Sequence, residues 1–179
     1  MKKMRAVIIT DQGFEDPEVI YPFYRLQAAG IEVNIATKGA ANVKGKFGFP
    51  VLALLKPKEP TDAGKLQAKD YDLVVVPGGH VAPDNIRQIK EVLAFIKAMY
   101  KNGKLIASIC HGPWVLISAG ILRGKKATCY PSMVDDLINV GAKYLDEPVV
   151  VDANVITSRR PRDLPVFMER VISEFNKRN

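Results

Sequence analysis

The residues with the clearest chemical potential are Cys110 and His111, which follow an apolar run and precede Gly112-Pro113. A strand, a tight turn carrying a reactive side chain, and then a helix make up a nucleophile elbow. Gly112 allows close backbone approach, and Pro113 suits a first helical turn. A sulfur above a helix N-terminus favours the thiolate form. The pattern therefore predicts Cys110 as a nucleophile, and the alternative is a buried structural cysteine at a strand end.

Two other segments can supply chemistry to such a cysteine. Glu15 follows an apolar run near the N-terminus, where a carboxyl with a raised pKa can hydrogen-bond the thiol and act as a general acid or base. The alternative for Glu15 is an exposed acidic residue at a helix start, where the helix dipole favours it. Gly78-Gly79 also follows an apolar run, and its N–H groups, with that of His111, can form an oxyanion hole. The alternative for the glycines is a simple tight turn.

The same residues argue against bound cofactors and metals. Gly78-Gly79 does not form a G-x-G-x-x-G fingerprint, so a dinucleotide is not expected. The sequence has only one other histidine, His80, and therefore offers no crowded set of metal ligands. We expect no cofactor and no metal ion.

Periodicity along the chain predicts the elements that position these residues. Buried strands and helices alternate, with helix starts at Asp16-Pro17 and stops at glycines. The predicted strands cover residues 4–10, 31–37, 72–77, 104–109 and 126–130, with a hairpin at 149–151 and 155–157 and a short β-excursion at 42–55. The predicted helices cover residues 16–29, 86–100, 113–119, 133–140 and 161–176, and residues 56–63 form a proline-punctuated loop.

This alternation predicts an α/β fold with a doubly wound, mostly parallel sheet flanked by helices in three layers, as one domain over residues 1–179. In such folds ligands bind at the carboxyl ends of the strands. Three features follow strand ends in this prediction: the loop after Thr10, the glycines after Pro77, and Cys110. We expect the three to share one pocket.

Composition narrows the class of protein. The chain has 179 residues, 47% of them hydrophobic and 25% charged, with a net charge of +7, an ordinary globular balance. Its basic residues are not interleaved with aromatic residues, so nucleic-acid binding is not expected. Two cysteines are too few for a disulfide framework, and a free thiol suits a reducing compartment. No apolar segment is long enough for a signal peptide or a membrane span, so we expect a cytoplasmic protein without membrane contact.

Taken together, these motifs resemble the PfpI family of the ThiJ/PfpI superfamily, which has a class I glutamine amidotransferase-like, flavodoxin-like fold. The resemblance covers nearly the whole chain. It rests on Phe14-Glu15-Asp16, Val76-Pro77-Gly78-Gly79-His80, Ala107-Ser108-Ile109-Cys110-His111-Gly112-Pro113, Ile117-Ser118-Ala119-Gly120, Leu122-Arg123-Gly124-Lys125, Val149-Val150-Val151-Asp152, Ile156-Thr157-Ser158-Arg159-Arg160-Pro161 and Asp163-Leu164-Pro165.

The resemblance implies roles for individual residues. Cys110 resembles the family's nucleophile, Glu15 the acid that hydrogen-bonds it, and His111 the neighbouring base. Asp84 matches an acidic residue that an adjacent subunit supplies, which implies a homo-oligomer, a dimer or a hexamer. Archaeal members usually have glutamate at that position, so the shorter aspartate puts the reach to His111 in doubt. Trp114 replaces a common glutamine and either narrows the pocket mouth or fills the core.

The resemblance implies a cysteine-dependent hydrolase or lyase that acts on reactive carbonyls or glycated protein in stress protection, as a deglycase or glyoxalase. The first alternative is an intracellular cysteine peptidase, which the Asp84 substitution makes less favoured. The second is a non-enzymatic redox sensor, since a low-pKa thiol oxidises readily. A chaperone-like or nucleic-acid-associated protein has only the net charge in its favour.

Overall fold

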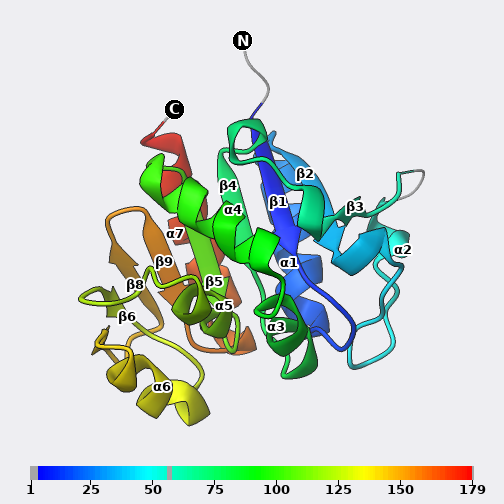
Figure 1. Cartoon of the computed structure of the whole chain (residues 1–179). Helices are drawn as coiled ribbons and strands as arrows, with labels where there is room; N and C mark the ends of the chain where they lie inside the picture. The colour runs from blue at the N-terminus through cyan, green and yellow to red at the C-terminus, as the bar shows by residue number, and fades with distance from the viewer. Residues whose placement is uncertain (1–3, 56–57, 179) are drawn as a thin grey trace.

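The computed structural model describes residues 4–55 and 58–178, and its centre is a seven-stranded sheet in the order β3-β2-β1-β4-β5-β9-β8 (Figure 1). All neighbouring strands run parallel except β8, which pairs with β9 as an antiparallel hairpin. The strands of this sheet are β1 (Arg5–Ile9), β2 (Glu32–Thr37), β3 (Thr61–Asp62), β4 (Leu73–Val76), β5 (Leu105–Ile109), β8 (Val149–Asp152) and β9 (Val155–Ser158).

Helices cover both faces of this sheet, which gives the predicted doubly wound α/β architecture. Helices α3, α4 and α5 lie in front of the sheet in Figure 1, and α1 and α7 lie behind it. The helices are α1 (Asp16–Ala28), α2 (Leu52–Leu55), α3 (Val81–Ile86), α4 (Lys90–Lys101), α5 (Pro113–Ser118), α6 (Val134–Asn139) and α7 (Leu164–Asn176). Single 3-10 turns occur at Lys38–Ala40, Ala63–Lys65, Ala68–Asp70, Pro131–Met133 and Pro161–Asp163.

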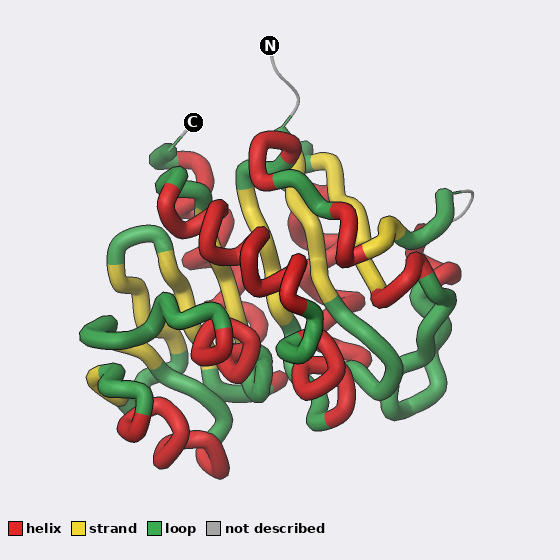
Figure 2. Tube along the Cα trace, viewed as in Figure 1, coloured by secondary structure: helices red, strands yellow, loops and turns green. Residues whose placement is uncertain are grey.

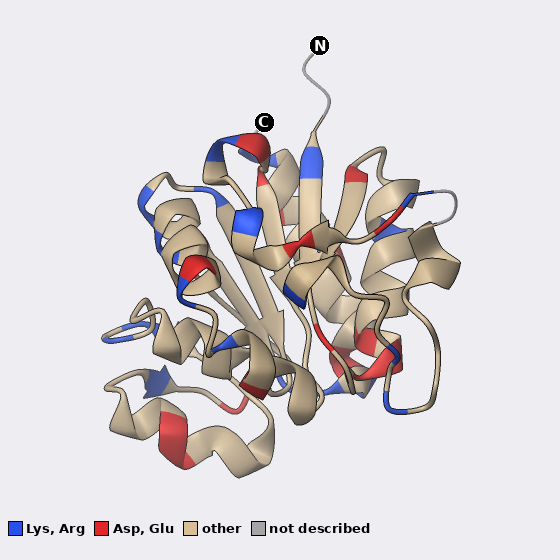
Figure 3. Cartoon of the chain, turned by 45° about the vertical axis from the view of Figure 1, so that its right-hand side comes forward, with Lys and Arg blue, Asp and Glu red and all other residues tan. Residues whose placement is uncertain are grey.

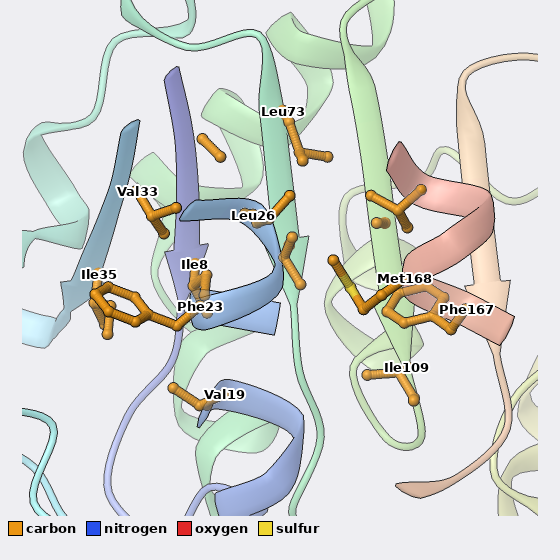
Figure 4. Packing of buried hydrophobic residues seen from close by; sticks show 14 of the residues in the cluster. Ile8, Val19, Phe23, Leu26, Val33, Ile35, Leu73, Ile109, Phe167 and Met168 are labelled. Atoms are coloured by element: carbon orange, nitrogen blue, oxygen red, sulfur yellow. The ribbon is translucent and has the colours of Figure 1, made fainter. Parts of the chain in front are cut away.

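The strands are apolar on both faces because each face is covered by helices. In β5, Leu105, Ala107 and Ile109 face one hydrophobic cluster, whereas Ile106 faces the other. The first cluster includes side chains of α1 and α7, and Figure 4 shows Phe167 and Met168 of α7 beside Ile109. The second cluster includes side chains of α3, α4 and α5.

The predicted β-excursion at 42–55 is confirmed only as a single antiparallel bridge, and its last four residues form α2. Its backbone makes one antiparallel bridge, Lys44 with Pro50, and otherwise runs as a loop into α2 (Figure 2). The carboxylate of Asp16 accepts hydrogen bonds from the N–H groups of Phe47 (3.0 Å) and Phe49 (3.2 Å). A side chain thus satisfies backbone donors that a strand would have directed to a neighbouring strand.

Two other predicted elements differ in extent. The helical spacing from Ile86 to Tyr100 belongs to two helices, α3 and α4, because the backbone is extended at Ile89. The predicted strand 126–130 is β6 (Lys126–Ala127) alone, which pairs with β7 (Lys143–Tyr144) outside the main sheet. In the predicted loop 56–63, residues 56 and 57 lie outside the described residues, and Thr61–Asp62 forms the edge strand β3.

Charged side chains are distributed over many elements, and Lys and Arg form no single basic face in the view of Figure 3. Among residues 4–55 and 58–178, no helix is long and apolar enough to cross a membrane.

The packing of α7 on the sheet yields a first prediction. Phe167 is fully buried, so Phe167→Ala removes a ring from the first cluster and should lower the free energy of unfolding by about 3–5 kcal/mol. Val166 is the neighbouring residue on the same helix and is 43% exposed, so Val166→Ala should change stability by less than about 0.5 kcal/mol. Urea unfolding monitored by circular dichroism measures both, and equal losses would contradict the packing described.

Candidate active site

Three loops meet at the carboxyl ends of β1, β4 and β5, which are adjacent in the sheet. The N–H of Glu15 donates to the carbonyl of Gly78 (3.2 Å), which joins the loop after β1 to the loop after β4. A Cβ atom at Gly78 would lie 2.7 Å from the Cβ of Cys110, so the loop after β4 also contacts the end of β5. The structure therefore brings together the segments that the strand pattern placed at one edge.

Cys110 occupies a strained turn between β5 and α5, with φ +62°. This left-handed conformation is uncommon for residues other than glycine and is retained where the surroundings enforce it. Here the N–H of Cys110 donates to the carbonyl of Ser158 (3.1 Å), and its carbonyl accepts from the N–H of Tyr130 (3.0 Å). A Cβ at Gly112 would lie 2.2 Å from the carbonyl oxygen of Val76, so the turn requires glycine there. The backbone is that of the predicted elbow.

The Cys110 side chain is buried, and only 4% of the residue is exposed. Burial raises the pKa of the thiol, and the neighbouring Glu18 carboxyl raises it further, while the N–H groups of Gly79 and His111 act in the opposite direction. The expectation that the helix N-terminus favours a resting thiolate is therefore wrong. Burial outweighs the backbone donors, and the sulfur holds its proton until a reaction removes it.

The carboxyl beside Cys110 belongs to Glu18, whereas Glu15 was predicted for this place. Glu18 is fully buried in the first turn of α1, and its Oε2 accepts a hydrogen bond from the N–H of Gly78 (2.7 Å). Its side chain interacts with that of Cys110. Burial raises the pKa of Glu18 to about 8, so the carboxyl carries a proton at neutral pH.

Glu15 has a different partner. Its carboxylate forms an ion pair with Lys46, which extends from the loop held by Asp16. Glu15 precedes α1, so its side chain does not share the helix face that packs on the sheet. The sequence did contain a signal for Glu18: helical spacing places it on the buried face with Pro22 and Leu26, where an acidic residue is unusual.

His111 lies against the sulfur, although adjacent side chains usually diverge. Its Nδ1 is 3.3 Å from Sγ of Cys110, and its Nε2 is 3.4 Å from Oγ of Ser132. Burial and the nearby charge of His80 lower the pKa of His111 to about 4. The ring is therefore neutral at physiological pH and can accept a proton.

Asp84 is exposed on α3, and its carboxylate forms no hydrogen bond or ion pair with His111 among the residues that the structure describes. Its contact with a neighbouring subunit remains a prediction. Within this chain, the acidic side chain whose charge acts on His111 is Asp136 of α6.

The oxyanion hole was predicted from the N–H groups of Gly78, Gly79 and His111. Gly78 is wrong in this set, because its N–H is already bonded to Glu18. The N–H groups of Gly79 and His111 both act on the sulfur of Cys110. Gly79 has φ +90°, and a Cβ there would lie 2.5 Å from the carbonyl oxygen of Gly13, so only glycine fits. The geometry leaves two converging donors beside the reactive atom.

Within the described residues, no group of three or more His, Cys, Asp and Glu side chains is arranged to hold a metal ion. The chemistry that the site offers is that of a thiol, a neutral carboxyl, a neutral imidazole and two backbone N–H groups.

Known proteins resemble this chain over nearly its whole length. The model of the DJ-1/PfpI family matches residues 4–174. Deglycase PH1704 of Pyrococcus horikoshii is 41% identical over 169 residues, which cover 94% of this chain and 98% of that protein. Protein/nucleic acid deglycase 2 of Escherichia coli is 38% identical over 169 residues, 93% of this chain and 94% of its own. The crystal structure of Drosophila melanogaster DJ-1beta is 32% identical, with a TM-score of 0.87 over 97% of this chain and 91% of that one. The chain described here belongs to the DJ-1/PfpI family.

Proposed function

We propose that this protein is a cysteine-dependent deglycase that acts on reactive carbonyls or on their adducts with protein groups. The observation that carries the proposal is the buried, protonated carboxyl of Glu18 beside the thiol of Cys110. A nucleophile next to a neutral proton donor suits addition to a carbonyl, in which one oxygen gains charge and then a proton. The names of the Pyrococcus horikoshii and Escherichia coli relatives, both deglycases, support it.

The first step is addition of Cys110 to the carbonyl carbon. A C–S bond forms, the π electrons of the carbonyl move to its oxygen, and the N–H groups of Gly79 and His111 stabilise that oxygen. The thiol proton passes to Nδ1 of His111, 3.3 Å from the sulfur. The product is a hemithioacetal once the oxygen is protonated.

With methylglyoxal, the following steps need only water. A proton leaves the carbon bonded to sulfur and another is added to the neighbouring carbonyl carbon, which oxidises the first carbon and reduces the second. The result is a lactate thioester, and hydrolysis releases lactate and the free thiol. Oε1 of Glu18 is buried and has no hydrogen-bond partner among the described residues, so Glu18 has an oxygen free to move these protons. With a glycated amine, the amine leaves with a proton when sulfur takes its place.

One observation places the redox sensor lower, whereas a peptidase would use the same thiol, imidazole and N–H groups as the deglycase. A redox sensor needs a thiol that ionises readily, whereas burial raises the pKa of Cys110. If Asp84 reaches the site of a neighbouring subunit, His111 gains a carboxylate partner. That arrangement would favour the peptidase.

Replacement of the nucleophile tests the proposal directly. Cys110→Ser should lower lactate formation from methylglyoxal, and amine release from a glycated amine, at least about 10³-fold. Cys129, the other free cysteine, is buried on the opposite side of the sheet, and Cys129→Ser should keep most of the activity if the variant folds. A fluorogenic peptide assayed in parallel detects peptidase activity. Wild-type rates in Cys110→Ser would show that the mechanism is wrong.

The pH dependence of turnover tests the role of Glu18. Activity should fall above about pH 8 as Glu18 loses its proton, and again near pH 4 as His111 gains one. Glu18→Gln cannot transfer a proton, so its rate should fall about 10²–10⁴-fold, and the remaining activity should lose the alkaline decline. Glu15→Gln is the matched control three residues away and should keep that decline. The assignment fails if Glu15→Gln, and not Glu18→Gln, removes it.

The same carboxyl makes stability depend on pH. Native Glu18 keeps its proton up to about pH 8, whereas an unfolded glutamate releases it near its ordinary pKa of 4.5. Rising pH between these values therefore favours the unfolded state. Relative to wild type, Glu18→Gln should gain roughly 3 kcal/mol of stability between pH 5 and pH 8. Urea titrations at several pH values measure this gain, and a constant difference across the range would contradict the buried neutral carboxyl.

A further inference from the structure

The imidazole of His111 is packed among three other rings. The ring centroid of His80 lies 4.2 Å away at an interplanar angle of 48°, that of Tyr130 lies 4.7 Å away at 28°, and that of Trp114 lies 5.0 Å away at 61°. These separations are within or slightly below the usual range for aromatic pairs, so all three rings contact His111. Nδ1 of His111 must point at the sulfur to accept its proton. The three ring contacts set the orientation of the imidazole and therefore the direction of Nδ1.

Two of the three rings are held from outside the cluster. Nε1 of Trp114 donates to Oδ2 of Asp136 (2.8 Å), and the guanidinium carbon of Arg87 lies 5.6 Å from the Trp114 ring centroid. Tyr130 is fixed through its backbone, which donates to the carbonyl of Cys110 (3.0 Å). Both residues are half-buried.

His80 differs from these two residues. It is exposed, and among the described residues its ring contact is with His111 alone. Its backbone is nevertheless well placed, because it follows Gly79, which fits closely against the loop after β1, and precedes α3. An anchored backbone thus presents an imidazole that meets solvent on one side and His111 on the other.

The charges around His111 give this contact a chemical consequence. The ionisable groups that act on it are His80, Lys46 and Asp136, with the thiol of Cys110 at Nδ1 and the phenol of Tyr130 in ring contact. Lys46 is paired with Glu15, and Asp136 is bonded to Trp114. His80 is the remaining group of the three, and its charge lowers the pKa of His111.

We propose that His80 is a positioning residue for His111: its ring completes the packing that directs Nδ1 at the Cys110 sulfur, and its charge controls whether His111 can take the thiol proton. A positive charge on His80 opposes an imidazolium in contact with it. This inference rests on the proposed roles of Cys110 and His111. The proton acceptor of the site is thereby positioned by a residue that does not touch the sulfur.

The charge effect is measurable without turnover, because the chain contains only two histidines. His80→Phe keeps a ring, removes the charge and leaves His111 as the single imidazole in the NMR spectrum. The pKa of His111 should then rise from about 4 by about one unit, since a like charge has been removed while burial is kept. An unchanged His111 titration in His80→Phe would overturn the proposal.

The packing effect is separated by a second variant. His80→Ala removes both ring and charge, and should slow alkylation of Cys110 by iodoacetamide at pH 7 about tenfold, whereas His80→Phe should stay within about threefold of wild type. Gln88→Ala, an exposed change in the turn after α3, is the control and should leave alkylation unchanged. Equal rates for wild type and His80→Ala would show that the ring does not position His111.

These outcomes are independent of the proposed reaction. A wild-type protein without deglycase turnover would refute the proposed function, yet the His111 titration and the alkylation rates would still report on His80. Conversely, full turnover in wild type, with neither measurement altered in the variants, would refute only the role of His80.

Discussion

The structure depends on a carboxyl group that cannot easily be ionised where it lies. Glu18 is enclosed between α1 and the end of β4, where the N–H of Gly78 donates to it and the Cys110 side chain interacts with it. These partners do not offset the desolvation of a carboxylate, so the group retains its proton. Glu18 and Cys110 then compete for one negative charge, and the site can hold that charge on sulfur only while the carboxyl stays neutral.

The remaining architecture serves this pair. Gly78 must lack a side chain because Cys110 and Glu18 fill the space on either side of it. The strained backbone at Cys110 is enforced by hydrogen bonds to Ser158 and Tyr130, segments that lie well beyond β5 in the sequence. Two hydrophobic clusters, one on each face of the sheet, make the strands rigid enough to hold such a turn. The reactive groups therefore lie on loops, and each loop is anchored by the buried strand that precedes it.

Most of the fold follows from the hydrophobic periodicity of the sequence and from the glycines and prolines at the ends of its elements. The strand–helix alternation, the hairpin around Ala153 and the elbow at Cys110 have local signals, and the structure contains them. The loop 42–51 could not be predicted in this way, because its shape is determined by Asp16, a residue more than twenty-five positions earlier. The short β6 is also set by distant partners, since Thr128 donates its N–H to the Thr157 hydroxyl.

The site was predictable to a similar degree. Cys110 and His111 are adjacent in sequence and lie together in the structure as a pair, but the carboxyl beside the sulfur was assigned three residues too early. Two carboxylates near a helix start look alike in a sequence, and only the helix phase separates them: one precedes the helix, and the other faces the sheet. The sequence could not show that the N–H of Gly78 is taken up by Glu18 and is therefore missing from the oxyanion hole. That outcome depends on the direction in which one N–H points.

The hydrogen bonds of Asp16 to the loop that carries Lys46 and Phe47 have a consequence for divergence within the family. The path of this loop depends on the Asp16 carboxylate, on Gly45, which fits against it, and on backbone hydrogen bonds such as that from the N–H of Lys46 to the carbonyl of Phe14. The side chains at positions 46 and 47 are thus free to be exchanged without refolding the segment. An exchange of Lys46 would then change the charge next to Glu15 while Cys110 and His111 keep their positions.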